Sequence, residues 1–204
     1  KEMASKGMEP STAHYNMVLS ACARKKNQAK MCSLLLSEME KRGIRKNEMT
    51  FQSALQCYAS SNQTEKCLEL WKQVEDKDGS ELEIDLKLYT TMLFVLGKFT
   101  RSEANETIEG IIEKVDKSGY ALDSPYFNCL GMIYSKWGRI EEALGLVKEM
   151  KVYGLEPSDG FYGAVLGALN RTGNYQETLK VLDEMVKGGV PFGVYSGSSA
   201  LWAA

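Results

Sequence analysis

Residues 126–150 read YFNCLGMIYSKWGRIEEALGLVKEM, and residues 161–185 read FYGAVLGALNRTGNYQETLKVLDEM. The second stretch begins 35 residues after the first and repeats its order of residue types. Each has an aromatic opening, an aliphatic stretch, a basic residue, a glycine, an acidic patch and a closing methionine. A pattern that returns at a fixed period indicates a repeat protein.

The same pattern extends over the rest of the chain. Aromatic residues recur at intervals of 36, 38, 38 and 35 residues, at Tyr15, Phe51, Tyr89, Phe127 and Tyr162. They divide the chain into five repeat units, 12–47, 48–85, 86–123, 124–158 and 159–193. Residues 1–11, KEMASKGMEPS, resemble the end of such a unit, so we expect a leader or earlier repeats before them. Residues 194–204 are expected to begin a further repeat or to form a tail.

Within each unit, apolar residues fall at the i, i+3, i+4, i+7 spacing that marks one face of an amphipathic helix. The first helix of unit one has this stripe at Tyr15, Val18, Leu19 and Cys22, and the second helix of unit five has it at Thr178, Leu179, Leu182 and Met185. One glycine between the two helices, such as Gly138, and another after the second, such as Gly154, suit helix C-termini. Each unit is therefore predicted to be a helical hairpin.

A single hairpin of this size cannot bury its own apolar face, so the units must stack on one another. The sequence predicts an all-α fold, a right-handed α-solenoid superhelix of stacked helix-turn-helix repeats of about 35 residues. Two segments interrupt the regular period. We expect EDKDGSELEID (75–85) to lengthen the turn after unit two, and FTRSEANET (99–107) to lengthen the turn inside unit three.

The composition excludes several classes of protein. The chain has 204 residues, 44% of them hydrophobic and 25% charged, which is ordinary for a globular protein. No apolar run approaches the ~18–20 residues that span a bilayer, so no membrane partner is expected. The formal net charge of −2 argues against a non-specific polyanion binder, although it is compatible with a local basic groove.

The residues of catalytic and metal sites are scarce. The five cysteines form no CxxC pair, and the single histidine, His14, leaves no Cys/His zinc grouping. We expect reduced cysteines in the core, with a disulfide or a redox role as the alternative. There is no deaminase signature and no nuclease-type aspartate cluster, so the sequence offers no reaction centre. We therefore expect no enzyme activity, no metal, no cofactor and no small-molecule substrate.

A cation recurs at position 13 of the units. This position holds Arg24, Ser60, Lys98, Lys136 and Arg171. Stacking of the units would align the four cations along one side of the solenoid, where they could bind the phosphates of a single strand. The alternative is that each cation is a solvated residue that the helix dipole favours at the end of the first helix.

Polar side chains recur at two other positions. Position 5 holds Asn16, Gln52, Thr90, Asn128 and Gly163, and the last position holds Asn47, Asp85, Asp123, Ser158 and Gly193. An amide or hydroxyl that is exposed on the groove face of a helix can hydrogen-bond to the edge of a base. The same residue types also cap helices well, and the two roles can coexist.

The turns GMEPS (7–11) and GLEPS (154–158), the unit openers HYN (14–16) and YFN (126–128), and the KxGxxEEAxxLxxEM pattern of residues 136–150 resemble the pentatricopeptide repeat family of the P type. The resemblance covers nearly the whole chain. It implies that the solenoid binds single-stranded RNA and that each repeat reads one base through position 5 and the last residue. The implied base-reading residues are Asn16, Asn47, Gln52, Asp85, Thr90, Asp123, Asn128 and Ser158, and the phosphate-binding residues are Arg24, Lys98, Lys136 and Arg171.

The resemblance also implies base preferences. Thr90 with Asp123 would favour guanine, Asn16 with Asn47 a pyrimidine such as cytosine, and Asn128 with Ser158 a pyrimidine weakly. Gln52 with Asp85 has no clear meaning, and the two glycines of unit five offer no side-chain contact. Position 2 carries an aliphatic residue that sandwiches the base in the family, and here only Met49 fits.

The resemblance implies a plant organellar protein, in the chloroplast rather more than the mitochondrion, that acts in RNA maturation such as intron splicing, transcript processing or stabilisation. Self-association or a protein cofactor would supply the specificity that five repeats lack. The alternative is a protein-binding scaffold subunit of an organellar ribosome or polymerase assembly. Net acidity, the two units without a clear base preference and the departures at position 2 support that alternative.

Overall fold

The computed structural model describes residues 9–75, 84–191, 193–194 and 196–198. Every secondary-structure element within these ranges is an α-helix, as the sequence predicts. The contacts divide the chain into an N-terminal half, residues 1–99, and a C-terminal half, residues 100–204. Most of the EDKDGSELEID segment, residues 76–83, lies outside the described residues. None of the described helices is both long and apolar enough to cross a bilayer.

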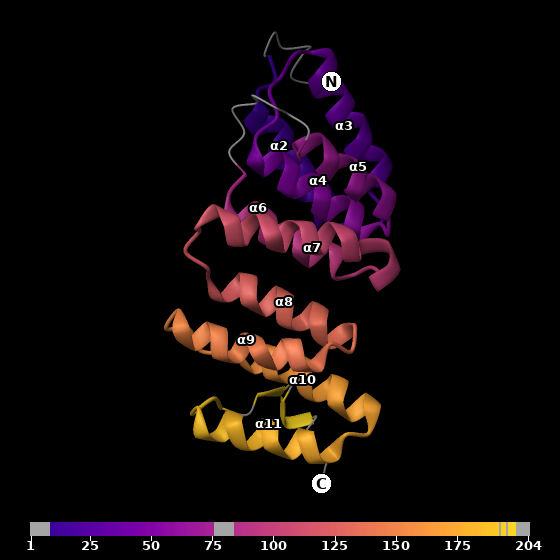
Figure 1. The fold of residues 1–204 in the computed structure, drawn as a ribbon. Helices are drawn as coiled ribbons and strands as arrows, with labels where there is room; N and C mark the ends of the chain where they lie inside the picture. Colours follow the sequence, from indigo (N-terminus) through magenta and orange to yellow (C-terminus); the bar gives the residue numbers. More distant parts are fainter. Residues whose placement is uncertain (1–8, 76–83, 192, 195, 199–204) are drawn as a thin grey trace. The chain divides into compact units, whose positions relative to one another are not determined.

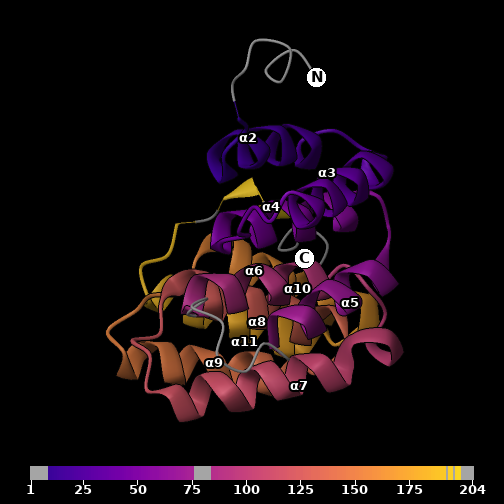
Figure 2. The same cartoon turned by 90° about the horizontal axis from the view of Figure 1, so that it is seen from above.

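The N-terminal half is a stack of helical hairpins. Its helices are α2 (Thr12–Ala23), α3 (Ala29–Lys41), α4 (Glu48–Ser60), α5 (Thr64–Glu75) and α6 (Leu86–Leu96). Helix α2 packs on α3 and α4, and α4 packs in turn on α5 and α6. Helix α4 therefore lies between α2 and α6, as Figures 1 and 2 show.

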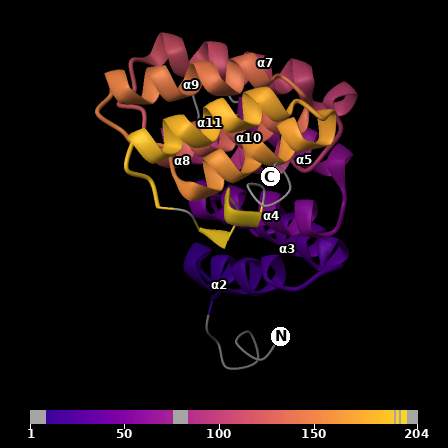
Figure 3. The same cartoon turned by 90° about the horizontal axis from the view of Figure 1, so that it is seen from below.

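The C-terminal half repeats this arrangement. Its helices are α7 (Arg101–Ser118), α8 (Ser124–Lys136), α9 (Ile140–Val152), α10 (Asp159–Thr172) and α11 (Tyr175–Lys187). Helix α8 packs on α9 and α10, and α10 packs on α9 and α11, which lies beside it in Figure 3. Residues 194 and 196–198 are again helical.

The segment FTRSEANET lengthens a helix, and the prediction of a longer turn was wrong. Helix α7 has 18 residues and begins at Arg101, only five residues after α6 ends at Leu96. Thr100 and Glu103 form a capping box, in which the Thr100 backbone N–H donates to Glu103 Oε2 at 2.9 Å. Because the box satisfies the first free N–H groups, the helix starts there and absorbs the extra residues.

The core follows the predicted apolar stripes, with two exceptions. The aromatic openers of all five units are buried: Tyr15, Phe51, Tyr89, Phe127 and Tyr162. Burial of such a side chain contributes about 1.5–3 kcal/mol. Val18 and Leu179, however, are 46% and 57% exposed. They lie on α2, which packs only on α3 and α4 among the described helices, and on α11, which packs only on α10.

Glycines end the helices in the predicted way. Gly138, in the turn between α8 and α9, has φ 75°, and Gly154, after α9, has φ 68°. Side chains strain the backbone in this left-handed region, so glycine is the residue that ends a helix there at least cost. The Leu155 N–H then donates to the Met150 carbonyl at 2.9 Å and closes the turn.

Four of the five cysteines are core residues. Cys22, Cys32, Cys57 and Cys67 are buried in the N-terminal half, Cys129 is half-buried in the C-terminal half, and none of these five described residues forms a disulfide. Burial raises the pKa of the Cys67 thiol to about 12 and that of Cys129 to about 11. Thiols that stay protonated at neutral pH are poor nucleophiles and poor metal ligands, which agrees with the predicted structural role.

Candidate nucleic-acid interface

The last residue of four repeat units caps the helix that follows it. The Thr50 N–H donates to Asn47 Oδ1 at 3.1 Å, and the Leu88 N–H donates to Asp85 Oδ1 at 2.8 Å. In the C-terminal half, Tyr126 N–H donates to Asp123 Oδ1 at 3.0 Å and Phe161 N–H to Ser158 Oγ at 3.2 Å. The capping role of these residues is therefore confirmed, and each cap contributes about 1 kcal/mol to stability. Base reading by the same side chains stays a prediction.

Position 5 and the last residue meet in unit one. Asn16 Nδ2 donates to Asn47 Oδ1 at 2.9 Å, although the two residues are 31 apart in the sequence. The Thr50 hydroxyl donates to Asn16 Oδ1 at 2.7 Å and accepts from the Asn47 backbone N–H at 3.1 Å. The three side chains thus form one network at the start of α4.

The network buries one of the two amides, which differs from the prediction. Asn16 is only 8% exposed, whereas we expected an exposed amide on the groove face. Its oxygen and one of its N–H groups are satisfied by Thr50 and Asn47, which is what burial of an amide requires. Asn47 is exposed, and its Oδ1 accepts from Asn16 and Thr50. Its Nδ2, a pure donor, is the atom that this arrangement leaves for a ligand.

An open hollow of about 810 Å³ lies beside this network. It is lined by Ser11, Thr12, Ala13, Asn16, Met17, Ser20, Arg24, Asn47 and Met49. Four residues predicted separately therefore converge on it: the pair at position 5 and the last position, the position-13 cation and the one aliphatic residue at position 2. Within the described ranges, the Arg24 backbone N–H donates to the Cys22 carbonyl but its side chain has no hydrogen bond or ion pair, so its charge is uncompensated at this surface.

The other pairs are arranged less uniformly. In unit four the Ser158 hydroxyl donates to Asn128 Oδ1 at 3.0 Å, so position 5 and the last residue meet again. Gln52 instead donates to Glu48 Oε1 at 2.8 Å, and the Thr90 hydroxyl donates to the Leu86 carbonyl of its own helix at 2.8 Å. These contacts hold Gln52 and Thr90 against their own helices.

The four predicted phosphate ligands lie at the C-terminal ends of the first helices. Arg24 is the C-cap of α2, Lys98 follows α6 by two residues, and Lys136 and Arg171 are in the last turns of α8 and α10. The helix dipole favours a cation at each of these positions. The Lys98 ammonium lies 4.8 Å from the centre of the Phe94 ring, and Arg171 Nη2 donates to the Ser135 carbonyl at 3.5 Å. Arg171 therefore joins α10 to α8, a structural role that the sequence did not suggest.

The helix start after unit five is built differently. Gly193 has no side chain that could cap this helix. The side chain of Asp159, in the first turn of α10, caps it instead. Asp159 Oδ1 accepts from the backbone N–H groups of Gly193 and Ser196 at 3.0 and 3.3 Å, and also from the Ser196 hydroxyl. A Cβ at residue 193 would overlap the Asp159 carboxylate. The sequence gives no signal for this contact. A capping residue ordinarily lies within a few positions of the N–H groups that it accepts from, whereas Asp159 lies 34 positions from Gly193.

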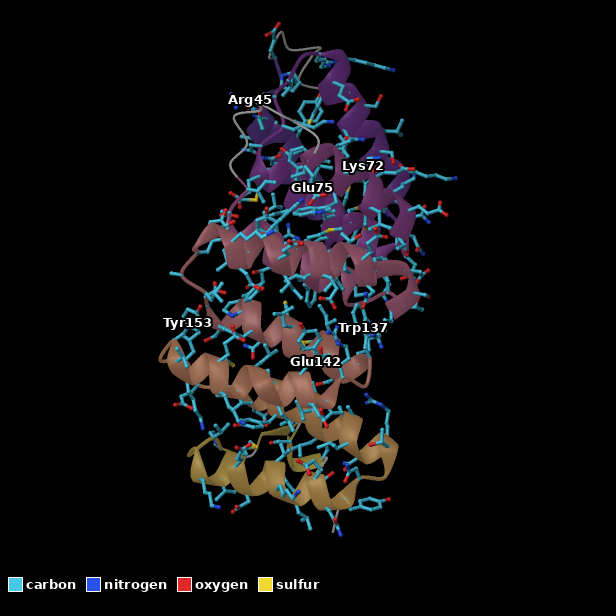
Figure 4. All side chains as sticks on the ribbon, viewed as in Figure 1. Arg45, Lys72, Glu75, Trp137, Glu142 and Tyr153 are labelled. Atoms are coloured by element: carbon cyan, nitrogen blue, oxygen red, sulfur yellow. The ribbon has the colours of Figure 1, made fainter. Side chains whose placement is uncertain are left out.

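An arginine cluster at the α8–α9 turn was also missed. Arg139 bonds to Glu142 and, at 2.6 Å, to Glu109 of α7, while its guanidinium lies 4.4 Å from the centre of the Tyr134 ring. The hydrogen bonds to Glu142 and Glu109 raise the pKa of Arg139. Figure 4 shows Glu142 near Trp137 at this turn, at the end of the α8–α9 hairpin away from Tyr153. The cluster joins α7 to this hairpin, and its two carboxylates more than balance the charge of the one guanidinium.

Comparisons with protein families agree on one family. The model of the pentacotripeptide-repeat region of PRORP matches residues 1–95, the model of the PPR repeat matches residues 126–155, and that of the pentatricopeptide repeat domain matches residues 145–191.

Curated relatives from Arabidopsis thaliana point the same way. One pentatricopeptide repeat-containing protein is 30% identical over 101 residues, which are 50% of this chain and 17% of that protein. A second, named chloroplastic, is 26% identical over 65% of this chain and 16% of its own length. A small ribosomal subunit protein is 27% identical over 90% of this chain and 43% of its own length. The chain thus spans about a sixth of the length of the first two relatives.

Solved structures share the fold. The crystal structure of the maize pentatricopeptide repeat protein PPR10 has a TM-score of 0.72 and 22% identity, and the match covers 98% of this chain and 28% of that one. The pentatricopeptide domain of Arabidopsis protein-only RNase P 1, solved in complex with tRNA, has a TM-score of 0.68 and 14% identity, with 94% and 97% covered. These likenesses confirm the predicted α-solenoid class.

Proposed function

Since this chain belongs to the pentatricopeptide repeat family, we propose that it binds single-stranded RNA on the face formed by its first helices. Each of the five repeat units is proposed to contact one nucleotide. The chain acts as a binding module, and chemistry on the RNA is left to other proteins. PPR10 has been solved with an 18-nucleotide RNA element and the RNase P domain with tRNA, which supports RNA as the ligand class.

The hollow of unit one carries this proposal. An amide pair, an aliphatic side chain and an uncompensated cation meet there around an open space of about 810 Å³. These are the groups that recognise the three parts of a nucleotide: the edge of a base, its face and its phosphate. Met49 is 51% exposed at this surface, so it has room to contact a base.

The Asn47 amide supports a base preference. Because its oxygen is committed to Asn16 and Thr50, only Nδ2 donors remain for a ligand. A pyrimidine that offers O2 and an unprotonated N3, as cytosine does, has acceptors on the matching edge. This agrees with the pyrimidine that the family resemblance implies for Asn16 and Asn47. Guanine presents donors at N1 and N2 and would suit a carboxylate better.

The test compares two charge reversals that differ only in place. Arg24→Glu puts a negative charge into the hollow, and Lys25→Glu makes the same change in charge one residue later, outside the residues that line it. We expect Arg24→Glu to weaken binding of a randomised single-stranded RNA about tenfold and to lower the salt slope by about 0.7, as loss of one phosphate contact predicts. Lys25→Glu should bind nearly as the unmodified chain does. Equal effects of the two variants would contradict the proposed site.

We place this activity in organellar RNA maturation, such as intron splicing, transcript processing or stabilisation, in the chloroplast or the mitochondrion of a plant. The support is that the three relatives described above come from Arabidopsis thaliana and that one of them is named chloroplastic. Fractionation of the tagged full-length protein followed by sequencing of the RNA that cross-links to it tests both parts. Recovery only from the cytosol would contradict the placement.

A protein-binding scaffold is the second candidate. It is favoured by the match to a small ribosomal subunit protein over 90% of this chain. In that case the same face would hold a peptide or a helix of a partner protein. A stoichiometric protein partner that survives nuclease and high salt during purification would favour this role.

A further inference from the structure

Helix α6 carries an exposed aromatic ring at a repeat position that the predicted site residues do not include. Phe94 is 45% exposed, and the Lys98 ammonium lies 4.8 Å from the centre of its ring. Large apolar side chains on the outside of a helix are normally scattered singly and need no explanation. Phe94 is of interest because of its position within the repeat.

The register of α6 against α2 places Phe94 on the ligand-facing side. Asp85 begins α6 as Ser11 begins α2, and the buried residues Tyr89, Leu93 and Leu96 correspond to Tyr15, Leu19 and Cys22. In this register Thr90, Phe94 and Lys98 correspond to Asn16, Ser20 and Arg24, respectively. All three of those α2 residues line the hollow of unit one. Phe94 therefore stands between the base-reading and the phosphate-binding positions of its repeat.

We propose that Phe94 is a stacking platform for one unpaired base of single-stranded RNA and that Lys98 binds the phosphate of the same nucleotide. The proposal rests on the proposed function and adds a site to it. Bases stack on aromatic side chains in proteins that bind single strands, because every base has a flat π-face. At position 2 of this repeat Lys87 stands where the family has an aliphatic sandwich residue, so Phe94 supplies the apolar contact that Lys87 lacks.

The charge next to the ring points to a nucleotide as the occupant. An apolar peptide would gain from the ring but would have to desolvate the Lys98 ammonium without an opposite charge to replace its water. A nucleotide offers a flat apolar face and an anion a few ångströms apart. Lys98 can exchange its contact with the ring for one with a phosphate at little cost, since an exposed cation–π contact contributes only about 0.5–1 kcal/mol.

The experiment separates stacking from charge with two substitutions and two probes. Phe94→Leu keeps an apolar side chain of similar size but removes the π-face, and Phe94→Trp keeps a π-face. The probes are a fluorescein-labelled randomised 12-nucleotide RNA and an abasic ribose-phosphate strand of the same length, titrated by anisotropy at low salt. Circular dichroism melting of each variant checks that the fold is unchanged.

We expect Phe94→Leu to weaken binding of the RNA about tenfold and to leave binding of the abasic strand unchanged. Phe94→Trp should bind the RNA as well as the unmodified chain does, or better. Equal RNA affinity of Phe94→Leu and the unmodified chain would overturn the stacking site while the proposed function stands. An equal loss for both probes would also overturn it, because the ring would then act only on Lys98. If the unmodified chain binds neither probe, the proposed function fails and this site fails with it.

Discussion

Two helix starts in this chain meet the same need with different side chains. At α4, Asn47 accepts from the Thr50 N–H and Asn16 accepts from the Thr50 hydroxyl. After Gly193, Ser196 takes the place of Thr50, and its N–H and its hydroxyl both donate to Asp159. In both places the hydroxyl accepts in return from the backbone N–H of the capping position, at 3.1 and 3.2 Å.

The difference lies in what remains for a ligand. The two amides at α4 satisfy the helix start and still leave Asn47 Nδ2 as a free donor side by side with Arg24 and Met49. Asp159 satisfies the other helix start from the preceding helix, and the glycine at residue 193 leaves no side chain to contact a base. The cap is a requirement of folding, whereas the identity of the residue that supplies it decides whether a polar group remains at the junction for the proposed contact with a base.

The largest expected effect comes from replacing Gly193 with asparagine, the residue that caps α4. Gly193→Asn should destabilise the C-terminal half by about 1–3 kcal/mol, because its Cβ would overlap the Asp159 carboxylate. The double variant Asp159→Ala/Gly193→Asn removes the overlap and lets the introduced amide oxygen accept from the Ser196 N–H, so most of the loss should return. Urea unfolding of both single variants and the double variant measures the coupling. If the changes in the free energy of unfolding of the two single variants add up to that of the double variant, the direct contact between Asp159 and residue 193 is contradicted.

A smaller effect is expected when the first junction loses its cap. Asn47→Ala should cost about 1–2 kcal/mol, because the Thr50 N–H loses its acceptor and the buried Asn16 amide loses a partner. Asn47→Asp is the matched control, since its carboxylate accepts both bonds, and its stability should stay within about 0.5 kcal/mol of the unmodified chain. If urea unfolding finds the two variants equally unstable, the network does not act as described.

The cysteines can report where each variant acts, with the smallest expected signal. Four of them are buried in the N-terminal half and Cys129 lies in the C-terminal half. Because the pKa of Cys67 is raised to about 12 and that of Cys129 to about 11, both thiols stay protonated and react slowly at pH 8, and faster as pH rises. Labelling followed by peptide mass mapping should show faster reaction of Cys129 in Gly193→Asn, and of the N-terminal cysteines in Asn47→Ala. The opposite assignment would contradict the division into halves.

Much of the fold could be predicted because it depends on local periodicity. The apolar stripes of helices such as α4 and α10, and glycines such as Gly154, follow from spacing and backbone geometry alone. The extra residues of unit three were predicted to lie in a turn. They lie in helix α7 instead, because the capping box of Thr100 and Glu103 starts the helix at Arg101. The exposure of Val18 and Leu179 depends on which neighbours cover a helix, and a stripe carries no such information.

The sequence predicted which residues of the candidate site lie on one side of the repeat, but it did not predict the hydrogen bonds between them. Repeat register was enough to bring Asn16, Asn47 and Arg24 together. The burial of Asn16 could not be foreseen, because it requires Thr50 as a third partner that sits where other units have Leu88 or Tyr126. Asp159 was missed for a similar reason, since its carboxylate accepts from residues more than thirty positions away.

We propose above that Asn47 presents donors to a base in a groove that binds single-stranded RNA. The most direct measurement is selection of a randomised RNA pool by the unmodified chain and by Asn47→Asp, with sequencing of the bound fraction at several salt concentrations. We expect enrichment of a pyrimidine at one position for the unmodified chain, a shift toward guanine at that position for Asn47→Asp, and unchanged stability of the variant. Identical enriched motifs from the two proteins, or no binding by either at low salt, would contradict it.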